Sequence, residues 1–187
     1  SASGTRNPPA APMSPPSVSL SLDRTVPPAE ETLTTSAMVI TNSAQREAQL
    51  SALQEHTKIS DRNALATIMG NIQQESKFIA NICEGGARVS YLECKSGGFG
   101  LIQWTSIGRY KGLGNFCAKY KCNPSSLDGQ VRWMINEPIF RRVLPQFEGG
   151  GQTISYYMRP AYIWLGWGIK GSRELYAYDY TKKMVLV

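Results

Sequence analysis

The chain has 187 residues, of which 42% are hydrophobic, and a formal net charge of +6 at pH 7. This length allows one sizeable domain plus extra segments, and no apolar run approaches the roughly 20 residues that span a bilayer. The single histidine, His56, lies in a polar stretch typical of a helix end, where its charge would be favourable. Zinc hydrolases usually need two or three histidine ligands, so we expect no metal and no cofactor.

The charge is unevenly distributed along the chain. Residues 61–187 carry sixteen basic against nine acidic residues, whereas residues 1–60 have a net charge of −1. A basic folded part favours a polyanionic partner, such as nucleic acid or an anionic bacterial cell wall. Because no recognised nucleic-acid-binding motif is present, we expect no nucleic-acid partner.

Residues 1–36 contain seven of the eleven prolines and no aromatic residue. Such a segment cannot bury a core, so it is predicted to be an extended arm or linker. If the arm is ordered, we expect it to lie along a neighbouring protein of an assembly. Residues 37–187 are then expected to form the folded domain.

Helix signals dominate the rest of the chain. Ser43 can cap a helix that continues to about residue 56, and Ser60 or Asp61 can cap the next one. Apolar residues of that second helix follow 3-4 spacing. Further helices are expected over about 106–121, 127–137, 139–145, 154–162 and 172–180. The fold class is therefore predicted to be mainly α, with a small strand region.

The strand region is expected between residues 83 and 99, where two glycine pairs bracket residues 87–94 and the helical pattern breaks. This pattern indicates a short hairpin or an irregular loop. The spacing of the four cysteines does not match a structural zinc site. Local disulfides Cys83–Cys94 and Cys117–Cys122 are one interpretation, and free buried thiols are the other.

Glu75 is the residue in the least expected position. It follows Ile72 by three residues and Ile68 by seven, so it shares the buried face of its helix. Burial disfavours the charged carboxylate and raises its pKa, and a carboxylic acid that stays protonated can donate a proton to a glycosidic oxygen. The alternative is an exposed, inert acid at a helix end.

A second informative stretch runs from Gly97 to Trp104. Its glycines permit close approach of the backbone to a ligand. Gln103 offers hydrogen bonds to sugar hydroxyls or an acetamido group, and Trp104 offers a flat apolar face to a pyranose ring. The alternative for Trp104 is a place in the core.

These two stretches resemble a known family. The run from Asn71 to Ser76, followed by the run from Phe99 to Trp104, is similar to the phage tail lysozyme family of the lysozyme-like superfamily. The resemblance covers about residues 44–180 and implies a lysozyme-like fold, with a small strand region beside a cleft. It implies Glu75 as the general acid, and Ser76, Ser90, Gln103, Trp104 and Tyr110 as substrate-binding residues.

Other parts of the chain fit the resemblance less evenly. Residues 127–137 are similar to the family's next helix, and Arg173 falls in its closing helices, but Met158 stands where an acid is expected. The Glu-Ser pair is also similar to that of bacterial lytic transglycosylases. The motifs therefore specify the superfamily more than one reaction.

A second carboxylate is implied in the strand region, where T-even-type phage lysozymes carry the acid that positions water. Glu84 is favoured for this role and Glu93 comes next, while Ser90 is near the place of the active-site hydroxyl of those enzymes. Either acid can instead be a solvated loop residue. If neither acid points into the cleft, a one-acid transglycosylase mechanism is expected, in which the substrate's own hydroxyl attacks.

The resemblance implies a peptidoglycan glycosidase of a phage virion or tail that acts on the bacterial cell wall or periplasm. It would cleave the glycan between N-acetylmuramic acid and N-acetylglucosamine. Its partners would be peptidoglycan strands and, through residues 1–36, other virion proteins. The alternatives are a lytic transglycosylase and an inactive structural or wall-binding protein with the same fold.

Overall fold

A computed structural model describes residues 37–41, 43–95 and 97–187. The predicted N-terminal arm, residues 1–36, lies outside this described part. In the described part, seven α-helices confirm the prediction of a mainly helical fold. They are α3 (Ala44–His56), α4 (Arg62–Ser76), α5 (Ile107–Tyr120), α6 (Leu127–Asn136), α7 (Pro138–Gly149), α8 (Ile154–Leu165) and α9 (Arg173–Lys183).

Most helix starts follow from capping residues that the sequence displays. The side chains of Ser43, Asp61, Ser106, Ser126 and Thr153 each accept a hydrogen bond from a backbone N–H of the first turn. Such a bond satisfies one of the donors that a helix start leaves without a partner. The predicted starts at 43, 61, 106 and 126 are thereby confirmed.

Helices α7 and α8 extend beyond their predicted ends, and each contains an internal proline, Pro145 or Pro160. The apolar face of α7 continues on both sides of Pro145, because Phe140 and Phe147 are both fully buried. Packing of that face outweighs the lost hydrogen bond. The helix ends at Gly150, whose φ of 71° breaks the helical conformation.

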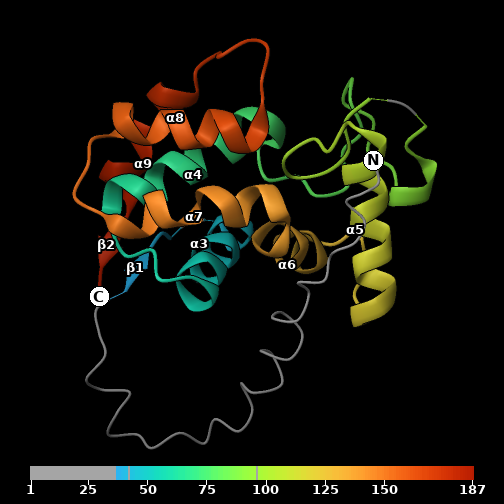
Figure 1. Ribbon diagram of the computed structural model, residues 1–187, viewed down its shortest axis with the longest axis horizontal. Coiled ribbons are helices and arrows are strands. Elements are labelled where there is room, and N and C mark those ends of the chain that lie inside the picture. Colours follow the sequence, from blue (N-terminus) through green and yellow to red (C-terminus); the bar gives the residue numbers. More distant parts are fainter. Residues whose placement is uncertain (1–36, 42, 96) are drawn as a thin grey trace, which may run out of the picture.

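Helix α4 is the centre of the domain. Its residues from Ala64 to Ile72 are buried all round, with Leu65, Ile68 and Met69 at 0% exposure, as expected for a helix surrounded by protein. It packs against α3, α7, α8 and α9, and Figure 1 shows it among these helices. Gly70 allows the crossing with α9, since a Cβ there would lie 2.6 Å from the backbone nitrogen of Ala177.

A small antiparallel sheet joins the two ends of the described domain. Strand β1 (Met38–Val39) pairs with β2 (Val185–Leu186), so Met38 faces Leu186. The sequence pattern did not indicate this sheet. The predicted strand region contains isolated antiparallel bridges, between Ile82 and Arg88, Cys83 and Phe99, and Phe99 and Trp104, together with a single 3-10 turn, Tyr91–Glu93.

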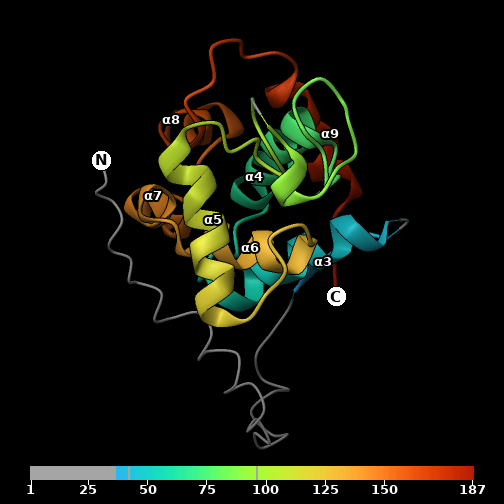
Figure 2. The ribbon, with the colours of Figure 1, turned by 90° about the vertical axis from the view of Figure 1, so that its right-hand side faces the viewer.

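The loop segment 77–106 and α5 form the other side of the molecule. Figures 1 and 2 show them together, beside the helices that surround α4. Disulfides Cys83–Cys94 and Cys117–Cys122 fasten this side, so of the two interpretations the paired cysteines are correct. No helix in the described residues has the length and apolarity needed to cross a bilayer. The C-terminal end of α4 leads directly into the loop segment and places Glu75 there.

Candidate active site

Glu75 is positioned by the abrupt end of α4. The next residues, Lys77 and Phe78, both have left-handed backbone conformations, with φ of 54° and 64°, which is uncommon for residues other than glycine. The buried hydroxyl of Ser76 donates to the carbonyl of Ile72 (3.3 Å) and accepts from the N–H of Phe78 (3.2 Å). Ser76 therefore ends the helix, and its buried hydroxyl is engaged in the helix end; the predicted substrate binding by Ser76 stays a prediction.

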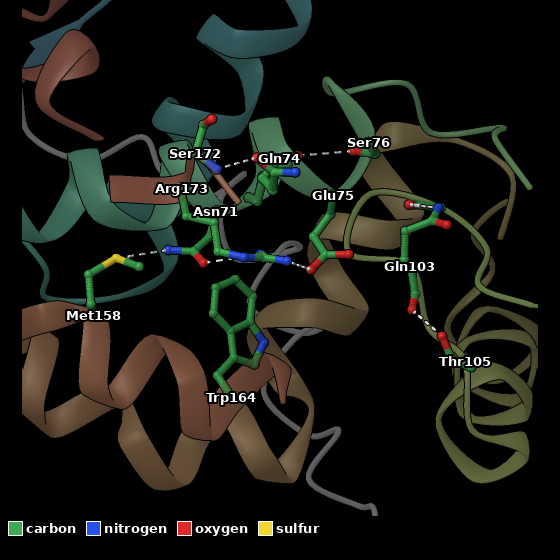
Figure 3. A network of polar contacts seen from close by, with 12 residues as sticks. Asn71, Gln74, Glu75, Ser76, Gln103, Thr105, Met158, Trp164, Ser172 and Arg173 are labelled. Atoms are coloured by element: carbon green, nitrogen blue, oxygen red, sulfur yellow. Dashed lines mark hydrogen bonds and ion pairs between the residues drawn. The ribbon is translucent and has the colours of Figure 1, made fainter. Parts of the chain in front are cut away.

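The Glu75 carboxylate is paired with an arginine from α9. Its Oε2 lies 2.8 Å from a terminal nitrogen of Arg173, and the two side chains are only 14% and 6% exposed. Figure 3 shows this pair at the centre of a polar network that joins α4, α8 and α9. The prediction placed Glu75 on the buried face of its helix, and the structure shows its side chain largely but not completely buried.

Arg173 is held in place by several groups. Its guanidinium lies 4.4 Å from the ring centroid of Trp167, and it donates to Oδ1 of Asn71 at 3.3 Å. The Asn71 amide in turn donates to the Thr67 carbonyl (2.8 Å) and contacts the sulfur of Met158 at 3.7 Å. Met158 stands where an acid was expected, so this position offers Arg173 no negative charge. The ion pair of Arg173 is with Glu75.

Burial and charge act on Glu75 in opposite directions. Desolvation is the largest effect and raises the pKa of the carboxyl, whereas the charge and hydrogen bond of Arg173, and then the charge of Arg109, lower it. The net result is a raised pKa, because the cost of burying the anion exceeds the attraction of the arginines. Such a carboxyl holds its proton to a higher pH than an ordinary glutamate does.

Gln103 and Trp104 have different environments although they are neighbours. Gln103 is partly exposed, with a φ of 55°, and its side-chain amide donates to the Gly100 carbonyl at 2.9 Å. Figure 3 shows Gln103 on the side of Glu75 opposite Arg173. Trp104 is 0% exposed and its ring N–H donates to Glu137 at 3.1 Å. The prediction of a sugar-facing Trp104 is therefore wrong for this structure, because its ring belongs to the core.

Both candidates for the second acid are engaged within the loop segment. Glu84 is exposed and accepts from the N–H of Gly98 at 3.0 Å. Glu93 accepts from the N–H and from the hydroxyl of Ser90, each at 3.0 Å, and these bonds hold the pKa of Glu93 below its ordinary value. Ser90 and Glu93 thus form a capping box for the 3-10 turn. In the described residues, no group of three or more His, Cys, Asp or Glu side chains is arranged to hold a metal ion.

The comparison with protein families gives one match, to phage tail lysozyme, over residues 44–142. The chain belongs to this family. Membership makes it a lysozyme-like, glycosidase-type protein that is associated with phage and acts on peptidoglycan. No curated protein and no solved structure matches the chain.

The matched segment contains Glu75 but ends before Arg173. Glu75 and Arg173 are far apart in the sequence and meet only in the fold. The sequence showed Arg173 only as part of the closing helices, without a role. The sequence signal in this region was Trp167, a large aromatic residue between two glycines in the loop before Arg173.

Tyr110 packs against Tyr91 of the loop segment. Its ring stacks on Tyr91 with centroids 4.3 Å apart. The Tyr91 hydroxyl donates to the Tyr110 carbonyl at 2.7 Å, and the Tyr110 hydroxyl donates to the Tyr91 carbonyl. Desolvation raises the pKa of Tyr91 to about 12, so this hydroxyl remains a donor. The pair holds the 3-10 turn against α5, and substrate binding by Tyr110 stays a prediction.

Replacing Arg173 with glutamine is expected to raise the pKa of Glu75 further. The substitution removes the largest influence that lowers this pKa, and leaves the desolvation. A pH titration of the Glu75 carboxyl carbon by NMR measures the shift directly. Arg173→Lys, which keeps the charge, should give the smaller rise. A Glu75 pKa that is unchanged or lower in Arg173→Gln would show that the ion pair does not control the proton.

Proposed function

We propose that this protein is a peptidoglycan glycosidase of a phage virion or tail, in which Glu75 is the general acid. The glycan between N-acetylmuramic acid and N-acetylglucosamine would be its substrate. The observation that carries the proposal is Glu75, whose side chain is 14% exposed and whose carboxylate pairs with Arg173, with a pKa raised by burial. A buried acid of this kind can deliver a proton to the leaving oxygen of a glycosidic bond.

The neighbours of Glu75 suit this role. Gln103, which Figure 3 shows on the side of Glu75 opposite Arg173, is partly exposed and has an amide of the kind that binds sugar hydroxyls or acetamido groups. The excess of basic residues in the folded part favours adsorption to an anionic wall. Partner proteins of the virion would be reached through residues 1–36, which lie outside the described part.

In the hydrolytic form of the proposal, Glu84 is the second carboxylate and Glu93 the next candidate. Hydrolysis needs such a group to activate water or to form a glycosyl intermediate. Both carboxylates already accept hydrogen bonds from their own loop segment. This observation favours the second candidate function, a lytic transglycosylase that works with Glu75 alone and forms an anhydro sugar by internal attack.

Mass spectrometry of the muropeptides released from purified peptidoglycan tests the proposal. Hydrolysis leaves a reducing muramic acid end, and we expect this product from the full chain. A product lighter by one water identifies the anhydro sugar and the transglycosylase. If neither product forms although the protein sediments with peptidoglycan, the glycosidase proposal fails and a structural or wall-binding role replaces it.

A further inference from the structure

A concave site that does not include Glu75 lies at the end of α4. It is a hollow of about 340 Å³, within the size range of pockets that bind small ligands, roughly 300–1,000 Å³. The hollow is formed by the start of α3, by the segment that follows α4, by Arg88 and by the residues around the start of α6. Its lining residues are Gln45, Arg46, Lys77, Phe78, Ile79, Ala80, Asn81, Arg88, Ser125 and Leu127.

The lining carries three positive charges, those of Arg46, Lys77 and Arg88, and includes no carboxylate. In the described part of the chain, no salt bridge engages any of the three. Like charges gathered in a concave surface create a field that attracts an anion. The hollow is therefore suited to a ligand that brings its own negative charge.

Arg46 is held in position by neutral groups. Its nitrogens donate to the Tyr180 hydroxyl at 2.6 Å and to Oε1 of Gln73 at 2.7 Å, and its guanidinium lies 4.9 Å from the ring centroid of Phe78. Arg88 is likewise held through Nε, which donates to Oδ1 of Asn81 at 3.0 Å. These contacts fix the two guanidinium groups without neutralising them, which lowers the cost of binding an anion.

The hollow is not an extension of the Glu75 surface. Lys77 lines the hollow and follows Glu75 by two residues, but Glu75 itself is not among the lining residues. A branched ligand can engage both places at once. Peptidoglycan is branched in this way, because short peptides with free carboxylates extend from its muramic acid units.

We propose that the hollow binds a carboxylate of the peptidoglycan stem peptide, an inference that rests on the proposed function of the Glu75 site. An extended peptide of four or five residues spans about 13–17 Å, which is enough to pass around a helix about 10 Å wide. Its carboxylate would meet the cationic groups in charge-assisted, forked hydrogen bonds. The apolar floor of Phe78, Ile79 and Leu127 would contact its alanine side chains.

The test is a binding titration of the full chain, carried out in Glu75→Gln so that catalysis plays no part. The probe is a soluble muramyl tetrapeptide, which has no glycosidic bond to cut. We expect Lys77→Gln/Arg88→Gln to weaken binding about tenfold or more, since each loses a charged donor. Lys182→Gln/Lys183→Gln removes the same charge from outside the lining and should bind as tightly as the parent.

Three results would overturn the inference. The first is equal binding of a muramyl tetrapeptide whose carboxylates are all amidated. The second is equal weakening by the two double variants, which would mean diffuse charge attraction. The third is stronger binding of inorganic phosphate than of the muramyl peptide, which would assign the hollow to phosphate-bearing wall polymers.

A kinetic arm separates this inference from the proposed function. In the chain with Glu75 intact, Lys77→Gln/Arg88→Gln should raise KM for intact peptidoglycan and leave KM unchanged for glycan stripped of its peptides. If the chain cleaves no glycan but the titration behaves as expected, the glycosidase proposal fails and the hollow remains a peptide site. If the chain cleaves glycan but the titration does not behave as expected, the glycosidase proposal stands and the peptide site in the hollow is rejected.

Discussion

Glu75→Gln is expected to reduce the release of glycan fragments from peptidoglycan by about 10²–10⁴-fold, the usual contribution of a general acid. Glutamine keeps the size of the side chain, and its carbonyl can still accept the hydrogen bond from Arg173, which lies 2.8 Å from Oε2 in the structure. It has no acidic proton to deliver to the leaving oxygen. Binding of the variant to insoluble peptidoglycan should therefore persist while cleavage is lost, as measured by sedimentation and by reducing-end release.

The matched control is Glu55→Gln, which removes one exposed carboxylate from α3. It changes the net charge equally and should leave cleavage unaltered. The pH profile adds a second readout, because only the protonated acid is active. Activity should fall as the pH rises through the raised pKa of Glu75. Retention of full cleavage by Glu75→Gln would remove the residue from the mechanism.

The helical framework was readable from the sequence because its signals are local. Caps such as Asp61 and Ser126 and the apolar periodicity act within a few residues of each other. The pairing of Met38 with Leu186 was not readable, because two short segments at opposite ends of the domain carry no periodic pattern. Helix α7 was underestimated because packing, rather than propensity, carries it past Pro145.

In the candidate site, too, features set by the local sequence could be predicted and features set by distant residues could not. The burial of Glu75 followed from helical periodicity, but its partner Arg173 comes from α9 and no local pattern connects the two. For Trp104, the local sequence is the same whether the ring faces a sugar or the core. What decides its place is a distant acceptor, Glu137, which takes the hydrogen bond from its ring N–H.

Glu137 is the buried group that ties the Trp104 segment to the rest of the domain. It is 2% exposed at the junction of α6 and α7, and its two oxygens accept from Arg109 at 2.5 and 2.7 Å. Arg109 also donates to the Trp164 carbonyl at 3.4 Å. The Glu137 carboxylate thus links the loop segment to α5, and Arg109 extends this link to α8.

Glu137→Gln is accordingly expected to destabilise the fold by about 3 kcal/mol, the lower end of the range for breaking a buried ion pair. Glutamine can still accept from Trp104, but it leaves the charge of Arg109 uncompensated, and Arg109 is 25% exposed. For a domain of this size the loss corresponds to a fall in Tm of about 6–12 °C, which scanning calorimetry measures.

Asp128→Asn provides the control, because it removes the carboxylate of another arginine pair, 3.7 Å from Arg132, whose acid is 78% exposed. Its cost should stay below about 1 kcal/mol, since water screens an exposed pair. Equal falls in Tm for the two variants would mean that burial gives the Glu137 pair no special weight. We expect a larger fall in Tm for Glu137→Gln than for Asp128→Asn, and unchanged cleavage chemistry in the protein that remains folded. This result would show that Glu137 supports the fold around the site, whereas Glu75 is proposed to act in the reaction.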